Sequence, residues 1–338
     1  MAIKSLRKIL IPLFISMVFF TINAQTNEKT IKAVKGDGIY KLLQRNGLDP
    51  AKYLNSFIEL NKSNLGNNNS LFAGRDYILP SSDNINTESA ESVTSVDYPI
   101  FGSKYSKVEI IDNQLKGTVY YLVAGHGGPD PGALGKYGNY TLPEDEYAYD
   151  VTLRLARSLI SHGALVYLIV RDMNDGIRDE SILKIDRDEV SYPNLSMPLN
   201  PLKRLKQRTD EINKLHKQHI GKFQRLVVIH LDSNIESEDI DVFFYYHERS
   251  IAGKNLAQKI HKTLNNKYKE YQPSRGYHGS ISTRSSLYML RKTDPPTVFI
   301  ELGNINNPRD QQRFLLNNNR EALAKWIGEG IILDYNSK

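Results

Sequence analysis

Three apolar runs constrain the fold of this chain most strongly, because each is rich in β-branched and aromatic residues and lacks polar alternation. They cover residues 118–124, 225–229 and 297–300, and they end at or just before His126, His230 and Glu301. Such runs, separated by stretches of helical periodicity, are typical of parallel strands that are buried on both faces. The sequence therefore predicts an α/β fold: a mostly parallel, twisted sheet with helices on both faces.

The polar residues at the ends of these runs suggest a common site. The carboxyl ends of the strands in an open α/β sheet face one crevice, so we expect His126, His230 and Glu301 to converge there. A lone histidine is usually structural, but two neutral imidazoles and one carboxylate form a catalytic zinc set with a fourth position left for water.

The third ligand of such a set should be a carboxylate at a helix start. Glu144 and Glu146 both qualify, since they open a helix predicted to run to Gly163. The helix face that points to the sheet includes Glu144, which we prefer, and Glu146 remains the alternative. Glu301 is then the candidate proton carrier. The alternative is that Glu301 is a buried structural carboxylate. Burial of an ionised carboxylate without a partner would cost much free energy, which weakens this alternative.

The N-terminus has the pattern of a secretory signal peptide, residues 1–24. Lys4, Arg7 and Lys8 precede an apolar core at 9–20, which is shorter than the roughly 20 residues that span a bilayer. An uncleaved anchor is the alternative. With cleavage, we expect an exported protein of the periplasm or cell envelope with no stable membrane anchor. The chain has no cysteine, so it has no disulfide framework.

The net charge gives little indication of a nucleic-acid partner. The formal charge is +6, and loss of the three leader cations leaves +3. A value this low does not favour nucleic-acid binding, and we expect none.

Residues 33–80 have the pattern of a small βααβ module, with turn and capping signals at Gly36–Asp37, Asn61 and Pro80. Together with Val34, Leu60 and Gly74, these residues resemble a LysM module, which implies binding of the glycan strand. A spacer that has lost binding is the alternative. The polar stretch 81–97 is predicted to be a flexible linker before a catalytic domain at 98–338.

Within the catalytic domain, further elements alternate between strand and helix. The pattern predicts strands at 164–171 and 242–247 and helices at 202–219, 250–268 and 311–332. Residues 172–201 form a polar insertion that is too long for an ordinary connection, so we interpret it as a lid or a wall of the substrate cleft. Its composition suggests no specific chemistry. The insertion could also block the cleft until a protein activator displaces it. Whether it has this inhibitory role stays open.

Several motifs occur in a specific order over residues 117–332: Gly125–Ala133, Glu144–Leu155, Val170–Asp172, Leu205–Arg208, Ile229–Ser233 and Glu301–Pro308. In this order they resemble the zinc-dependent N-acetylmuramoyl-L-alanine amidase family (Amidase_3 type). The resemblance implies one Zn²⁺ held by His126, Glu144 and His230, with Glu301 as the catalytic carboxylate. We also expect Arg208 and Asn304 to bind substrate. The departures are Asp232 where asparagine is usual, Asn304 in place of phenylalanine, extra residues before Glu144, and the large insertion.

The resemblance implies a peptidoglycan hydrolase that cleaves the amide bond between N-acetylmuramic acid and L-alanine, with the stem peptide bound in the cleft. The set of zinc ligands alone does not determine which bond the enzyme cleaves. A zinc carboxypeptidase or deacetylase acting on cell-wall material is therefore one alternative, and a non-catalytic wall-binding regulator is another.

Overall fold

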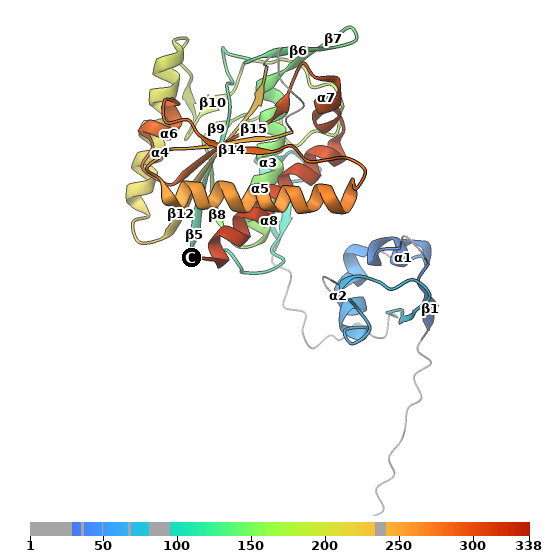
Figure 1. Cartoon of the computed structure of the whole chain (residues 1–338). Helices are drawn as coiled ribbons and strands as arrows, with labels where there is room; N and C mark the ends of the chain where they lie inside the picture. Colours follow the sequence, from blue (N-terminus) through green and yellow to red (C-terminus); the bar gives the residue numbers. More distant parts are fainter. Residues whose placement is uncertain (1–28, 35–36, 49, 67–68, 81–94, 234–240) are drawn as a thin grey trace, which may run out of the picture. The chain divides into compact units, whose positions relative to one another are not determined.

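The computed structural model describes residues 29–338 except 35–36, 49, 67–68, 81–94 and 234–240 (Figure 1). The chain divides into two compact units, 1–90 and 91–338, and the boundary falls inside the predicted linker. The predicted signal peptide, Gly36 and most of the linker lie outside the described residues.

The N-terminal unit has the predicted βααβ order. Its elements are β1 (Thr30–Lys32), α1 (Ile39–Arg45), α2 (Pro50–Leu60) and β2 (Asp76–Ile78), and the two strands pair antiparallel. Asn61 follows α2 and is buried; its side-chain amide donates to the Ile78 carbonyl at 2.9 Å and its oxygen accepts from the Ile78 amide at 2.8 Å. These bonds join the second helix to the closing strand.

The larger unit is built on a six-stranded sheet of order β14-β13-β15-β12-β5-β8. The neighbouring strands β8, β5, β12 and β15 are parallel, while β13 runs antiparallel to β15 and pairs in parallel with β14. This confirms the mostly parallel sheet. The strand bounds are β5 (Thr118–Ala124), β8 (Leu165–Leu168), β12 (Phe223–Asp232), β13 (Phe243–Tyr246), β14 (Ser280–Thr283) and β15 (Thr297–Asn304).

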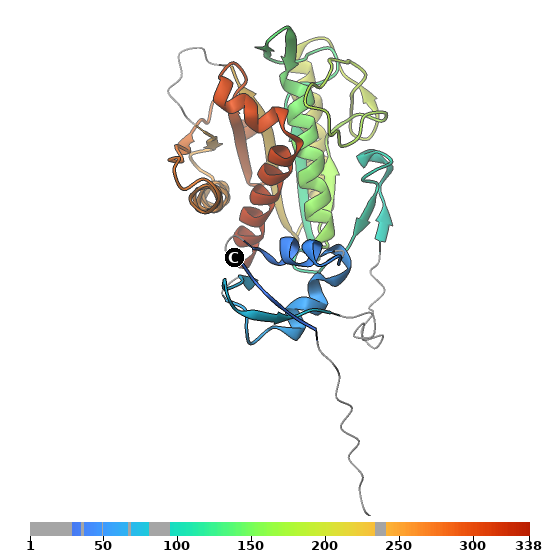
Figure 2. The same ribbon diagram turned by 90° about the vertical axis from the view of Figure 1, so that its right-hand side faces the viewer.

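Helices cover the sheet. Helices α3 (Glu144–Ser161) and α8 (Asn317–Asn336) lie side by side (Figure 2), and α5 (Ile251–Tyr271) packs against α8 and the strands β13 and β15. Helices α4 (Pro201–Gln218) and α6 (Tyr288–Lys292) lie on the other side of the sheet (Figure 1). The remaining elements of this unit are β3 (Ser95–Asp97), a 3-10 turn (Pro99–Phe101), β4 (Lys107–Glu109), β6 (Leu134–Tyr137), β7 (Tyr140–Pro143), β9 (Val170–Arg171), β10 (Val190–Ser191), β11 (Leu195–Ser196) and α7 (Pro308–Leu315).

Among the described helices, none combines the length and the apolar character needed to cross a bilayer.

The structure corrects two predicted boundaries. The last helix is two helices, α7 and α8, because Leu316 is extended and the Arg320 side chain takes up the freed carbonyls of Phe314 and Leu315. The strand predicted at 164–171 is broken after Leu168. Its end, β9, leaves the main sheet and pairs with β10 of the insertion, which in turn pairs with β11. The edge strand β14 was not predicted, since its sequence lacks a long apolar run.

A buried ion pair joins α3 to α8. Arg320 is fully buried, and its Nε lies 2.6 Å from Asp150 Oδ2, which Arg154 Nε also approaches at 2.8 Å. Arg320 also donates to the carbonyls of Arg178 and Glu180 at 2.8 and 3.0 Å. Removal of this guanidinium would take away one of the two cations at Asp150 and leave the Glu180 carbonyl without the donor described here.

We predict that Arg320→Ala lowers the free energy of unfolding by about 3–5 kcal/mol, the usual effect of breaking a buried ion pair on one side. Lys325→Ala on the same helix is the control, because Lys325 is exposed and its loss should change the value by less than about 0.5 kcal/mol. Urea unfolding of the two variants measures both values. Equal stability of the two variants would contradict the prediction.

Candidate active site

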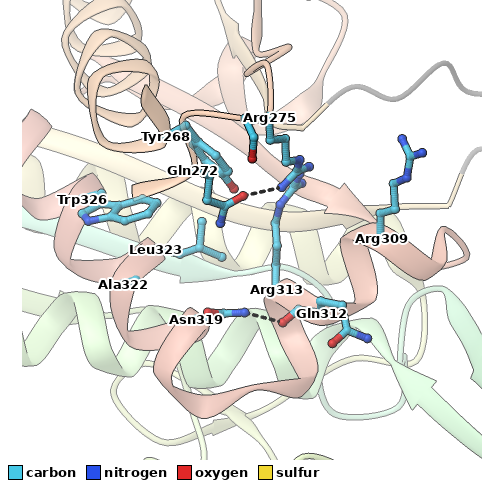
Figure 3. Close-up of a pocket in the computed structure, with 11 residues that line it drawn as sticks. Tyr268, Gln272, Arg275, Arg309, Gln312, Arg313, Asn319, Ala322, Leu323 and Trp326 are labelled. Carbon is cyan, nitrogen blue, oxygen red and sulfur yellow. Dashed lines mark hydrogen bonds between the residues drawn. The ribbon is translucent and has the colours of Figure 1, made fainter. Parts of the chain in front are cut away.

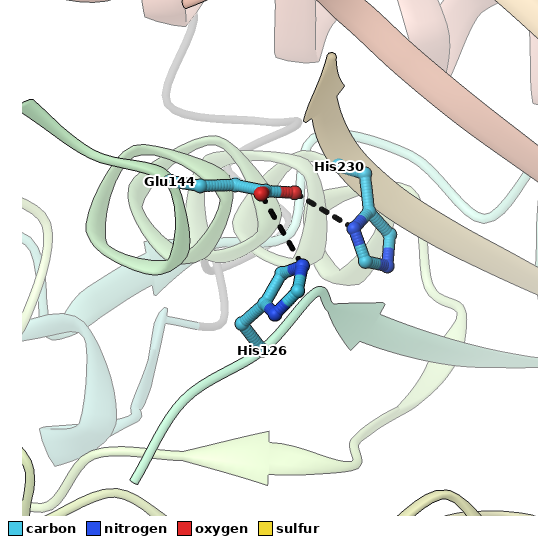
Figure 4. Close-up of side chains that lie close together, drawn as sticks. All are labelled: His126, Glu144 and His230. Carbon is cyan, nitrogen blue, oxygen red and sulfur yellow. Dashed lines mark hydrogen bonds and ion pairs between the residues drawn. The ribbon is translucent and has the colours of Figure 1, made fainter. Parts of the chain in front are cut away.

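His126, Glu144 and His230 meet at the carboxyl ends of β5 and β12 (Figure 4). Glu144 Oε2 lies 3.2 Å from His126 Nε2, and Glu144 Oε1 lies 2.8 Å from His230 Nδ1. The two imidazole centroids are 5.0 Å apart. One donor atom from each residue lies within 4.8 Å of the other two, so the three side chains could share one metal ion.

Glycines allow this close approach. Gly125 donates its N–H to the Ile229 carbonyl at 2.7 Å, which holds the end of β5 against β12 beside His230. A Cβ at Gly125 would come within 2.4 Å of the His230 ring. A Cβ at Gly132 would lie 2.7 Å from both Glu144 Oε2 and the His126 ring. The glycine-rich loop is therefore a steric requirement of the site.

The structure brings Glu144, rather than Glu146, to the histidines. The Glu144 oxygens also accept N–H groups from Ala133 at 2.9 Å and Leu231 at 3.2 Å, which orient the carboxylate. Glu146 points elsewhere: its oxygens accept from Arg178 at 2.7 Å and from the Asp186 amide at 2.9 Å.

The protonation of the three groups reflects their contacts. Burial alone would raise the pKa of Glu144, but its contacts with His126 and His230 hold that pKa well below its ordinary range. Burial alone would lower the pKa of His126, but Asp130 and Glu144 raise it to about 10. Burial lowers the pKa of His230. These contacts favour a protonated His126 beside an ionised Glu144, and a metal that took the same nitrogen would have to displace that proton.

Asp130, Arg204 and Phe299 support the two histidines, and the sequence analysis assigned no role to them. Asp130 Oδ2 lies 3.1 Å from His126 Nδ1, and Arg204 holds the same oxygen at 2.6 Å. Phe299 stacks on the His230 ring with centroids 4.5 Å apart. Partners of this kind fix the orientation of metal-binding histidines. The sequence feature that could have indicated a role for Asp130 is its position four residues after His126 in the glycine-rich loop.

Glu301 lies on β15 directly opposite His230 of β12. Paired positions on neighbouring strands point their side chains to the same face, so Glu301 faces the same side of the sheet as His230. Its Oε2 is buried and finds no hydrogen-bond partner among the described residues. Burial, and then the carboxylates of Glu144 and Asp232, raise the pKa of Glu301 well above its ordinary value.

A cavity of about 250 Å³ adjoins the two histidines, and α4, α6, β12 and β15 line it. Arg208 lines this cavity and donates to the His126 carbonyl, so it also supports the loop. Asn304 is buried at the end of β15, where its side-chain oxygen accepts the Asn306 amide at 2.8 Å. Of the insertion at 172–201, Pro201 lines the cavity and residues 172–200 do not.

A larger cavity of about 490 Å³ lies between α5, α7 and α8 (Figure 3). Its lining includes Arg275, Arg309, Arg313, Tyr268 and Trp326, and it contains none of the three residues grouped above. We place the active site at the histidines, because ligand chemistry identifies a catalytic centre better than cavity size does.

The family model described as N-acetylmuramoyl-L-alanine amidase (Amidase_3) matches residues 121–332, which is more than half of the chain. The chain belongs to this family. The match includes all four residues singled out above, His126, Glu144, His230 and Glu301. Family membership supports peptidoglycan amidase activity, the cleavage of the bond between N-acetylmuramic acid and L-alanine.

Named relatives of this amidase are distant in sequence. It is 24% identical over 229 residues to the germination-specific N-acetylmuramoyl-L-alanine amidase of Bacillus subtilis, a match that covers 66% of the chain and 82% of that protein. It is 25% identical over 225 residues to the probable cell wall amidase LytH of Staphylococcus aureus, covering 65% of the chain and 59% of LytH.

Solved structures similar to the amidase include the CwlD amidase of Clostridioides difficile in complex with the GerS lipoprotein, with TM-score 0.49 and 24% identity over 65% of this chain and 99% of that one. Another is the amidase Ami1 of Mycobacterium smegmatis, with TM-score 0.48 and 19% identity over 66% of this chain and 99% of that one.

We predict that Glu144→Ala in this amidase removes most of the bound divalent metal, whereas Glu146→Ala retains it. The two glutamates lie in the same helical turn and are both buried, but Glu144 alone of the two contacts the histidines. Metal analysis of the purified variants measures the difference. Equal metal content in both would show that Glu144 is not the ligand.

Proposed function

We propose that this protein is a zinc-dependent N-acetylmuramoyl-L-alanine amidase in which His126, Glu144 and His230 hold one Zn²⁺ and Glu301 carries the proton. The main support is the group of two imidazoles and one carboxylate, whose donor atoms lie within 4.8 Å of one another. Zinc accepts such ligands, and three protein ligands leave a position for the reacting water.

The residues around the ligands fit this use. Asp130 lies against the ring nitrogen of His126 that faces away from Glu144, and Phe299 fixes the plane of His230. When bound, zinc supplies a water of pKa about 7 and polarises the carbonyl of the scissile amide.

Glu301 is well suited to move the proton. Because its pKa is raised by burial and neighbouring carboxylates, the carboxylate is more basic than an exposed one. It accepts a proton from the attacking water and donates it to the amine of L-alanine as the amide bond breaks. The products are the free lactyl carboxylate of muramic acid and a stem peptide with a free amino terminus.

The cavity beside the histidines is the proposed site for the stem peptide. Arg208 and Arg204 place positive charge along its wall, and Leu287 and Tyr288 provide apolar contact. Arg208 acts there mainly through the His126 loop, whose carbonyl it binds. Asn304 stays a candidate for substrate binding through the turn that it holds at the end of β15.

Digestion of purified sacculi tests the reaction. The amidase reaction yields new alanine amino termini and intact stem peptides. Release of a terminal amino acid would instead indicate a carboxypeptidase, and release of acetate a deacetylase. No product at all from the zinc-loaded protein would favour a wall-binding regulator.

We predict that Glu301→Gln lowers kcat/KM on sacculi by at least about 100-fold, since general acid–base catalysis contributes about 10²–10⁴-fold. Zinc content should stay unchanged, because Glu301 is not one of the three grouped ligands. The melting temperature should not fall, since glutamine has the same size as glutamate and brings no charge into this buried position. Retention of wild-type activity would assign Glu301 a structural role.

We also propose that the N-terminal unit binds the glycan strand as a LysM-like module. Its support is the order of its elements and the matched positions Asp37 and Asn61. Asp37 accepts the Val34 amide at 2.9 Å and pairs with Arg45 at 2.8 Å, while Asn61 joins α2 to β2. A signal peptide at residues 1–24 would export the protein to the envelope, where this substrate lies.

We predict that removal of residues 29–80 from the inactive Glu301→Gln chain lowers binding to sacculi severalfold. Soluble N-acetylglucosamine oligomers should compete with the full-length inactive chain and have no effect on the shortened one. Cosedimentation with intact sacculi measures both. Equal binding by the two chains would support the spacer alternative.

A further inference from the structure

A second group of carboxylates lies between the start of α3 and the insertion at 172–201. Donor oxygens of Asp172, Asp186 and Glu189 lie within 4.8 Å of one another, and so do those of Asp145, Glu146 and Glu189. Glu189 belongs to both groups, so the acidic residues form one continuous cluster. None of them is a member of the His126–Glu144–His230 group.

Several oxygens in this cluster are buried without a hydrogen-bond partner. Asp145 and Asp172 are each only 1% exposed, and the Oδ2 of each has no partner within the described part of the chain. Asp186 Oδ1 is also buried without a hydrogen-bond partner in the described part of the chain. Buried polar atoms normally find partners, so three unpartnered carboxylate oxygens in one cluster leave acceptors that a bound cation could satisfy.

The charge of the cluster is also incompletely neutralised. Arg178 pairs with Glu146 and Asp175, which accounts for two of the carboxylates. Within the described residues, Asp145, Asp172, Asp186 and Glu189 form no salt bridge. Burial, with the repulsion of neighbouring carboxylates, raises the pKa of both Asp186 and Glu189 to about 7. Isolated buried carboxylates are strongly unfavourable unless a cation or a proton neutralises them.

We propose that this cluster is a calcium site, with Asp172, Asp186 and Glu189 at its centre and Asp145 beside them. All of its donors are hard carboxylate oxygens, which suit Ca²⁺ or Mg²⁺ rather than zinc. Calcium–oxygen distances of about 2.3–2.6 Å allow two ligands to lie up to about 5 Å apart, in agreement with the observed grouping. Calcium is favoured over magnesium, because magnesium usually keeps several waters and these oxygens are shielded from solvent.

Such an ion would join the insertion to the active-site framework. Asp172, Asp186 and Glu189 come from the insertion, whereas Asp145 follows the ligand Glu144 at the start of α3. Glu189 also accepts the Gly128 amide at 2.7 Å, in the loop that carries His126. Calcium would therefore hold the insertion in place beside the catalytic site. This inference does not depend on the amidase reaction.

Thermal unfolding of the full, zinc-loaded mature protein tests the proposal. The buffer is depleted of calcium and kept at constant ionic strength, and CaCl₂ or MgCl₂ is then added. We expect CaCl₂ to raise the melting temperature saturably by about 5 °C or more at saturation, and MgCl₂ to give a smaller shift at equal concentration. Zinc content should remain constant throughout.

Asp186→Asn should abolish the calcium-dependent shift, and without calcium it should melt no lower than the wild type, because it removes an uncompensated charge. Asp188→Asn is the matched control: Asp188 is exposed, lies two positions away and belongs to none of the grouped carboxylates. It should keep the full shift. Asp172→Asn serves as a second variant if Asp186→Asn does not fold.

Three results would overturn the proposal. The first is the absence of any cation-specific shift in the wild type. The second is a full calcium shift in both Asp186→Asn and Asp172→Asn. A larger shift with MgCl₂ than with CaCl₂ would reject calcium as the ion.

Discussion

The parallel pairing of β12 with β5 on one side and β15 on the other is the constraint on which the active site depends. Its register places Glu301 opposite His230, and the Gly125–Ile229 hydrogen bond holds the His126 loop against the same strand. Three residues distant in sequence therefore meet through backbone hydrogen bonds of one sheet. A shift of register by one residue would turn His230 to the other face.

Acidic side chains gather around this sheet end. Glu144, Asp130 and Glu301 lie there, and the acidic cluster includes Asp145 and Glu146 in the first turn of α3. Protein cations neutralise part of it, since Arg204 holds Asp130 and Arg178 holds Glu146. Bound cations at the histidine group and at the cluster would neutralise much of the remainder. The two proposed ions would therefore couple metal binding to the ordering of this end of the fold.

The main strands and the site were predictable because their signals are local. Strand β5, most of β15 and residues 226–229 at the centre of β12 are buried, so each is a continuous apolar run in the sequence. The glycines around His126 were visible as a motif, and their steric role follows from how closely His230 approaches. By contrast, β14 depends on its pairing with β13, and the break at Leu316 depends on Arg320, whose side chain is held by the distant Asp150.

The sequence by itself determined the α/β class, the family motifs and the candidates His126, His230 and Glu301, because residue type and spacing encode them. Only the tertiary structure shows which of Glu144 and Glu146 contacts the histidines. Both are buried in the first turn of α3, so periodicity separates them poorly, and only the contact with two histidines distinguishes them. The same holds for the acidic cluster, since Asp145 and Glu189 come together only when the insertion packs against α3.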